Sequence, residues 1–353
     1  MKRYIFNLLF AGVLFLQACS DNQNQDQAST TAENNSEQVV NVYTHRHYET
    51  DQRLFDRFTE TTGIKVNVVS AGADELIKKL ELEGERSPAD VLITVDAGRL
   101  HRAEELDLLQ PISSSVLDNN VPSSLKDPEG YWYGLTYRAR VIVYAKDRVK
   151  PGQLSTYEDL TQPKWKGKVL TRSSDNIYNQ SLLASIVASE GPEKAKNWAR
   201  GLKNNFAREP KGSDRDQVKA VAEGQGDVAI VNTYYLGLLL NSDNEEERKA
   251  GEAVGVFFPN QNGRGTHINI SGAGVTKHAP NKENAIRFIE FLTQDEAQKA
   301  FAEANFEYPV KKDVEVAPLL KSWGDFKVDS LNLAQLGEKN REAVMIFDEI
   351  GWK

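Results

Sequence analysis

The stretch VVNVY at residues 39–43 opens the pattern that decides the fold class. Over the next fifty residues, short apolar runs with strand-like alternation take turns with charged segments whose apolar residues recur at helical spacing, as at Leu54, Phe55 and Phe58. Strand, helix, strand, helix, strand at these spacings indicates a parallel α/β sheet. The expected strands are 39–43, 64–69 and 89–94, and the expected helices are 51–61 and 74–83.

A second region of the same kind follows. The expected strands there are 141–144, 168–170 and 227–231, and the expected helices are 180–189 and 192–202. A strand at 272–277 is expected to return toward the first region, followed by a helix at 282–292. The 353 residues exceed what one hydrophobic core usually serves, so two α/β lobes with a ligand cleft between them are expected. We expect residues 39–139 and 265–312 in the N-terminal lobe, and residues 140–264 and 313–353 in the C-terminal lobe.

The N-terminus is typical of an exported, lipid-anchored protein. Lys2 and Arg3 precede an apolar run over residues 4–16 that fits the hydrophobic region of a signal peptide. Leu-Gln-Ala-Cys at 16–19 resembles a bacterial lipobox, in which the cysteine is acylated. We therefore expect residues 1–18 to be a signal peptide, and residues 19–38 to be the lipidated Cys19 and a disordered polar tether. An ordinary signal peptide that happens to contain Cys19 is the alternative.

Composition excludes several classes of function. A net charge of −8 without a local basic patch is unfavourable for nucleic-acid binding. A single cysteine rules out an internal disulfide and a cysteine-based zinc site. The sequence contains no Gly-x-Ser-x-Gly, no His-Glu-x-x-His, no P-loop and no Gly-x-Gly-x-x-Gly after the first strand. We therefore expect a protein that is not an enzyme.

Tyrosines occur where ligand-binding loops are expected. His47 and Tyr48 follow the first strand, Tyr178 lies in a polar turn between a strand and a helix, and Tyr234 and Tyr235 follow the strand at 227–231. A single tyrosine at such a position is most often a packed ring. Three such loops at strand ends point to a hard, highly charged cation, because Fe(III) prefers anionic oxygen and a bound metal deprotonates a phenol.

The sequence resembles the ferric-ion-binding proteins of bacterial iron ABC importers, in particular the FutA-type group. The resemblance runs from about Val40 to the C-terminus, and the residues that carry it are 41–48 (NVYTHRHY), 88–91 (PADV), 134–140 (GLTYRAR), 232–235 (NTYY) and 270–275 (ISGAGV). It implies a class II periplasmic-binding-protein fold that closes around Fe(III), with Fe(II) as a further possible ligand. The ligands implied are His47, Tyr48, Tyr178, Tyr234 and Tyr235.

The resemblance also implies an ABC permease and its ATPase as partners. From the N-terminal segment we expect the protein to be lipid-anchored in the periplasm or on the outer face of the cell membrane, and we expect a monomer. His45 lies two residues before His47, so the sequence leaves open which imidazole binds the metal. His47 adjoins Tyr48 and matches the motif.

Arg138 is expected beside the metal. Fe(III) with four phenolates and a neutral histidine leaves about one negative charge, which a guanidinium would offset. Arg138 and Arg140 share a face of a strand-like run, and Arg138 lies nearer the expected cleft. A surface ion pair with a carboxylate is an equally good interpretation of Arg138.

Two other functions are open at this point. The first is a binding protein of the same fold for an oxyanion, a polyamine or an organophosphate, and the second is an exported hydrolase. Neither explains the set of one histidine and four tyrosines, and the hydrolase would lack a visible nucleophile and base.

Overall fold

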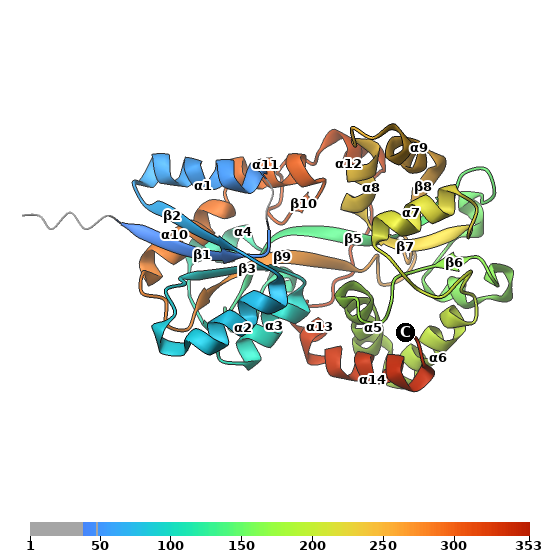
Figure 1. Cartoon of the computed structure of the whole chain (residues 1–353), viewed down its shortest axis with the longest axis horizontal. Helices are drawn as coiled ribbons and strands as arrows, with labels where there is room; N and C mark the ends of the chain where they lie inside the picture. Colours follow the sequence, from blue (N-terminus) through green and yellow to red (C-terminus); the bar gives the residue numbers. More distant parts are fainter. Residues whose placement is uncertain (1–37, 47–48) are drawn as a thin grey trace, which may run out of the picture. The chain divides into compact units, whose positions relative to one another are not determined.

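The computed structural model describes residues 38–46 and 49–353 (Figure 1). The predictions made for the signal peptide, Cys19, the tether, His47 and Tyr48 lie outside the described residues. None of the described helices is long and apolar enough to cross a membrane.

The described strands form one mixed sheet with the order β2-β1-β3-β9-β5-β7-β6, in which β4 pairs with β9 while β8 and β10 pair with β5. Their bounds are β1 Val39–Thr44, β2 Lys65–Ser70, β3 Val91–Val95, β4 Leu109–Gln110, β5 Tyr133–Ala145, β6 Val169–Leu170, β7 Val228–Asn232, β8 Val254–Phe257, β9 Ile268–Thr276 and β10 Tyr308–Pro309.

Strand direction follows the sequence pattern only in part. β1 is parallel to β2 and β3, and β6 is parallel to β7, as expected. The expectation that the second region is of the same parallel kind is wrong for β5, and the returning strand β9 is antiparallel too: β9 is antiparallel to β3, and β5 is antiparallel to β7, β8, β9 and β10. The physical reason is that β9 returns to the first strands after a long excursion, and a returning strand can pair in either direction.

β5 joins the two parts of the sheet. Its residues 133–139 pair with β9, and its residues 140–144 pair with β7. Figure 1 shows β5 continuing from the part that contains β1–β3 into the part that contains β6 and β7. The lobe boundary predicted between residues 139 and 140 coincides with this change of partner, and the division of the chain into lobes stays a prediction.

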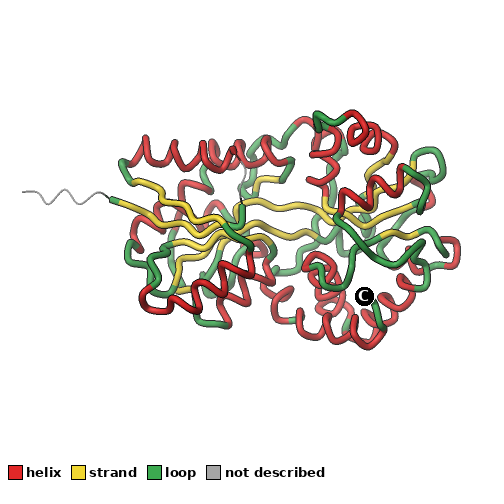
Figure 2. Tube along the Cα trace, in the orientation of Figure 1, coloured by secondary structure: helices red, strands yellow, loops and turns green. Residues whose placement is uncertain are grey.

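Helices cover both sides of the strands, as Figure 2 shows in red and yellow. The described α-helices are α1 Glu49–Thr62, α2 Ala73–Glu83, α3 Ala97–Glu105, α4 Ser115–Asn120, α5 Ile177–Glu190, α6 Pro192–Lys203, α7 Asp214–Ala222, α8 Thr233–Leu240, α9 Glu245–Ala253, α10 Lys282–Leu292, α11 Asp295–Asn305, α12 Pro318–Ser322, α13 Ala334–Glu338 and α14 Asn340–Ile350.

The apolar stripe predicted for the first helix is its buried face. Phe55 and Phe58 of α1 meet Phe288 of α10 edge to face, with ring centroids 5.3 and 5.1 Å apart. Burial of each such ring contributes about 1.5–3 kcal/mol, so this contact fixes α1 on the sheet. The order of strands and helices predicted over residues 39–94 is confirmed, with bounds that differ by no more than two residues.

Candidate metal centre

The three described tyrosines of the predicted ligand set begin two helices. Tyr178 is the second residue of α5, where Asn176 caps the helix by accepting a hydrogen bond from the Tyr178 amide at 3.2 Å. The expected placement of Tyr178 in a turn before the helix is therefore wrong, because Asn176 is a good N-cap and starts the helix earlier than the apolar pattern does. Tyr234 and Tyr235 lie in the first turn of α8, directly after β7.

The phenols of the two helices meet. The hydroxyl oxygens of Tyr178 and Tyr234 are 3.3 Å apart although the residues are 56 positions apart in the sequence. The rings of Tyr234 and Tyr235 are also in contact, with centroids 4.1 Å apart. Because α5 follows β6 and α8 follows β7, and these two strands are parallel neighbours, both helix starts lie at the same edge of the sheet.

The surroundings keep Tyr235 protonated while no cation is present. Burial raises the pKa of Tyr235 above its ordinary value, and the nearby groups Tyr178 and Asp214 raise it further. A multivalent cation would reverse this balance, since its charge favours the phenolate and three phenol oxygens would be its natural ligands.

Three guanidinium groups surround the ring of Tyr178. The Cζ atoms of Arg138, Arg140 and Arg172 are 5.9, 5.8 and 5.8 Å from its centroid. Arg138 is 1% exposed, which contradicts its interpretation as a surface ion pair. Burial acts against the charged form of Arg138, but Glu307 and the phenols of Tyr178 and Tyr234 raise its pKa, so it remains a cation.

One N–H group of the Arg138 guanidinium donates no hydrogen bond to the described residues. Its Nη1 donates to Ser271 Oγ at 3.3 Å, and its Nε is buried without a hydrogen-bond partner among the described residues. A buried donor without a partner costs free energy, and a bound anionic oxygen would remove that cost.

Arg140 supports the site from behind, a role that sequence reasoning did not assign to it. It donates to Asp214 Oδ2 at 2.7 Å, to Asn179 Oδ1 at 2.8 Å and to Asn232 Oδ1 at 3.2 Å. Asn179 follows Tyr178, and Asn232 directly precedes α8. Arg140 therefore ties together the starts of both tyrosine-bearing helices.

The two remaining predicted ligands, His47 and Tyr48, lie outside the described residues and stay predictions. His45 is described, and its Nδ1 is 3.3 Å from the backbone oxygen of Ala71. Within residues 38–46 and 49–353, no group of three or more His, Cys, Asp or Glu side chains is arranged to hold a metal ion.

Gly237 allows α8 to approach Phe306. A Cβ atom added at Gly237 would lie 2.5 Å from Phe306 Cγ, well inside contact distance. Phe306 ends α11 with a φ of 50°, so its backbone is held in a left-handed conformation that is unusual for phenylalanine. The close contact thus determines where the first turn of α8, with its two tyrosines, sits.

Gly237→Ala is expected to lower the free energy of unfolding by about 1–3 kcal/mol, because the added methyl group overpacks this contact. Alanine is the better helix former, so a loss of stability would point to the contact alone. Denaturant unfolding measures it. Gly152→Ala is the control, since nothing lies within 4 Å of a Cβ at Gly152. Equal stability of both variants would contradict this account of α8 packing.

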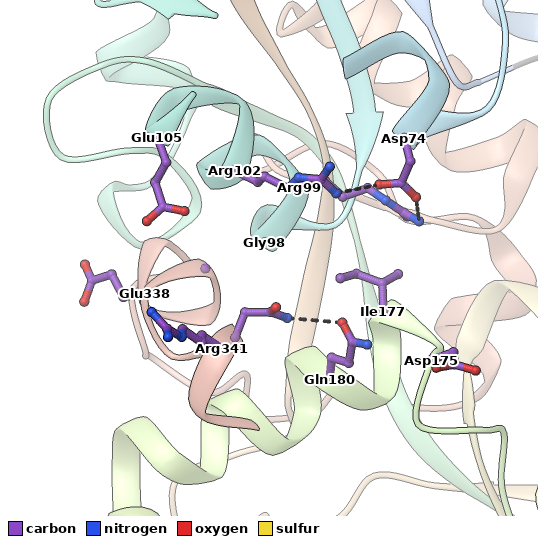
Figure 3. Close-up of a pocket in the computed structure, with 12 residues that line it drawn as sticks. Asp74, Gly98, Arg99, Arg102, Glu105, Asp175, Ile177, Gln180, Glu338 and Arg341 are labelled. Atoms are coloured by element: carbon purple, nitrogen blue, oxygen red, sulfur yellow. Dashed lines mark hydrogen bonds and ion pairs between the residues drawn. The ribbon is translucent and has the colours of Figure 1, made fainter. Parts of the chain in front are cut away.

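A polar cavity of about 580 Å³ lies next to the tyrosine cluster but does not contain it. Figure 3 shows α2 and α3 on one side of it and α5 and α14 on the other. Asp74 accepts hydrogen bonds from Arg99 and Arg102, both at 3.1 Å, and Asn340 reaches Gln180 at 3.3 Å. Of the charged side chains that line the cavity, Asp74, Arg99 and Arg102 thus form ion pairs with one another.

The fold is that of a solute-binding protein. The family model described as "Bacterial extracellular solute-binding protein" matches residues 86–332. The chain belongs to this family, which is one of transport proteins that act outside the cytoplasm and not one of enzymes.

Three similar proteins indicate which group within this family the chain resembles. "Iron uptake protein A1" of Synechocystis is 50% identical over 342 residues, which cover 97% of this chain and 94% of that protein. The structure titled "Trichodesmium (IdiA) (FutA) in complex with iron and citrate ligands" is 54% identical with a TM-score of 0.88 and covers 89% of this chain and 100% of its own. The Mannheimia haemolytica ferric iron-binding protein A, described in an open conformation, is 44% identical with a TM-score of 0.84 and covers 89% of this chain and 99% of its own. The resemblance to FutA-type proteins and the two-lobe fold are confirmed.

Proposed function

We propose that this protein captures Fe(III) outside the cytoplasm and delivers it to an ABC permease, whose ATPase drives import. The observation that carries the proposal is the meeting of Tyr178, Tyr234 and Tyr235 at one edge of the sheet, beside a buried arginine with a free donor. The iron-uptake name of the Synechocystis relative and the iron in the Trichodesmium structure support the same ligand.

The chemistry of the donors favours ferric iron over other solutes. Phenolate is an anionic oxygen ligand, and Fe(III) is the common biological cation that gains most from it. With His47 and Tyr48 completing the set, four phenolates and Fe(III) carry about one net negative charge, which Arg138 would offset. An oxyanion or organophosphate site would instead use helix N-termini with Ser, Thr and Gly and would leave the tyrosine set unexplained, and a polyamine would need carboxylates at this position.

Binding in this proposal is coupled to closure of the two parts of the protein. The described tyrosines belong to the part with β6 and β7, while β1, which His47 and Tyr48 follow in sequence, belongs to the other part. Iron would therefore hold the two parts together, and their separation would release it. The open conformation reported for the Mannheimia relative supports such a movement here. We place the lobes at residues 39–139 with 265–312 and at residues 140–264 with 313–353.

The test of the proposed function is the colour and the iron titration of the purified protein. Coordinated tyrosinate gives Fe(III) a ligand-to-metal charge-transfer band in the visible range, so stoichiometric ferric iron should produce a yellow to red protein with a sharp end point at one equivalent. Absence of the band on titration with ferric iron would contradict the proposed function. Titration with Fe(II) under anaerobic conditions tests the reduced ion separately.

Lipid anchoring is a further part of the proposal. Cys19→Ser should abolish acylation, and the protein should then leave the detergent phase for the aqueous phase in a partitioning experiment. Iron binding should be unchanged, because Cys19 lies outside the part of the chain that contains the described tyrosines. If Cys19→Ser partitions as the unmodified protein does, the lipobox interpretation is wrong. We expect the anchored protein to work as a monomer.

A further inference from the structure

Asp96 is a fully buried carboxylate at the end of β3. It caps α3, since its Oδ1 accepts from the Gly98 amide at 2.8 Å, and its Oδ2 accepts from Asn269 Nδ2 at 2.7 Å. The hydroxyl of Ser181 reaches both oxygens, at 2.8 Å each. Asp96 is thus bonded to three different parts of the chain.

These bonds cross from one part of the sheet to the other. Asp96 follows β3, whereas Ser181 belongs to α5, which follows β6. Ser181 lies three residues after Tyr178, on the same helix and one turn further on. Asn269 is the β9 residue that pairs with Arg138 of β5. One carboxylate therefore connects the helix of Tyr178 with the strand pair of Arg138.

Capping alone does not require Ser181. The Gly98 amide already provides the capping bond, and Asn269 provides a second donor. The other serines of α5 donate within their own helix: Ser185 donates to the Leu182 carbonyl at 2.7 Å, and Ser189 donates to the Ser185 carbonyl at 2.8 Å. Both of their hydroxyl oxygens also accept from Arg264. Ser181 forgoes this local bond and reaches across to Asp96 instead.

The arrangement at Asp96 is costly, which is typical of functional positions. Its φ is 82°, a backbone conformation that side-chain-bearing residues rarely adopt. Burial raises the pKa of Asp96, while the Ser181 hydrogen bond and the charge of Arg99 act in the opposite direction. Strained backbone and buried charge persist where the surrounding structure has a use for them.

We propose that Asp96 is a positioning residue of the iron site, which holds α5 through Ser181 in the arrangement that brings Tyr178 to Tyr234, and which releases α5 when the two parts separate. The proposal rests on the proposed function. Asp96 touches none of the three described tyrosines of the ligand set and acts through the helix. Its bond to Ser181 then stabilises the iron-bound arrangement and contributes little to the iron-free, open one.

The test compares Ser181→Ala with Ser185→Ala. Both serines are fully buried on the same helix, but only Ser181 bonds to the carboxylate. Ser181→Ala should weaken ferric binding in competition with a chelator by about tenfold, the lower end for a hydrogen bond to a charged group. It should also shift the charge-transfer band, because the position of Tyr178 changes. Ser185→Ala should retain the affinity and the band of the unmodified protein.

A second variant separates positioning from folding. Asp96→Asn keeps a good N-cap and a residue that tolerates positive φ, and it removes the charge. The effect of Ser181→Ala on iron affinity should shrink in the Asp96→Asn background, because the two side chains act through one contact. The melting temperature of the iron-free protein should be the same for Ser181→Ala as for Ser185→Ala.

Each outcome decides between the hypotheses. An unmodified protein without the charge-transfer band contradicts the proposed function and this inference together. A normal band with equal iron affinity in Ser181→Ala and Ser185→Ala contradicts the inference alone. A lower melting temperature of iron-free Ser181→Ala with unchanged affinity would show that the contact is merely structural. Equal effects of Ser181→Ala in both backgrounds would show that it does not act through Asp96.

Discussion

Tyr234→Phe and Tyr235→Phe should each lower the affinity for ferric iron by more than about 100-fold, and the double variant should lose the visible band. Loss of a residue that only supports a metal ligand already costs about 10–100-fold, and a ligand contributes more. Only a hydroxyl is removed in each case. The ring contact between Tyr234 and Tyr235, with centroids 4.1 Å apart, remains available to phenylalanine.

A matched control exists in the same protein. Tyr308 is 4% exposed, close to the 5% of Tyr234, and its hydroxyl is buried without a hydrogen-bond partner among the described residues. Tyr308→Phe removes that hydroxyl without breaking a bond, so it should leave iron binding unchanged and stability equal or slightly higher. Absorption titrations and chelator competition measure all variants.

The result that would contradict the tyrosine site is specific. If Tyr234→Phe and Tyr235→Phe bind ferric iron as tightly as Tyr308→Phe does, and their bands coincide, neither residue is a ligand. Loss of binding in one variant alone would remove the other from the predicted ligand set.

Ferric affinity should fall steeply as pH falls. A free phenol has a pKa near 10, and burial together with Tyr178 and Asp214 raises the pKa of Tyr235 further, so binding at neutral pH must displace the phenol protons. Each proton released makes the affinity about tenfold lower per unit decrease in pH, so the three described phenols predict about 1000-fold per unit and the full set of four about 10,000-fold. The sign follows because protons and iron compete for the same oxygens.

The pH dependence is measured by chelator competition, corrected for protonation of the chelator, between mildly alkaline and mildly acid pH. The double variant Tyr234→Phe/Tyr235→Phe is the control for the slope, which should be shallower by two protons wherever residual binding is measurable. If His47 is a ligand, the slope should steepen once its imidazole, with a free pKa near 6.5, becomes protonated. An affinity that is flat across this range would contradict tyrosinate coordination.

The local sequence pattern predicts which helices and strands form better than it predicts the residues at which they begin and end. The helix expected over 282–292 is α10 with identical bounds, because its apolar stripe and its polar flanks agree. Tyr234 and Tyr235 were expected at a strand end or a helix start, and they occupy the first turn of α8. Tyr178 was misplaced in a turn because the apolar period of α5 becomes visible only after its N-cap, Asn176.

Local sequence patterns do not predict roles that depend on contacts between residues far apart in the chain. Spacing puts Arg138 and Arg140 on one face of a strand, but it does not distinguish a surface ion pair from a buried cation. Only the packing of β5 against β9 and β7 buries both, and only the bonds to Asn179 and Asn232 show that Arg140 braces the starts of α5 and α8.

By itself, the sequence determined the alternation of strands and helices, the chemistry of the candidate ligands and the resemblance to ferric-ion-binding proteins, since each of these is carried by residues close together in the chain. The tertiary structure decided which phenols meet, which arginine lies beside them and that Asp96 of one part bonds to Ser181 of the other. The residues in these contacts are between 40 positions apart in the sequence, for Tyr178 and Arg138, and 85 positions apart, for Ser181 and Asp96. No local periodicity encodes such pairs, because they arise only when the strands pair in the sheet and the helices that follow them pack together.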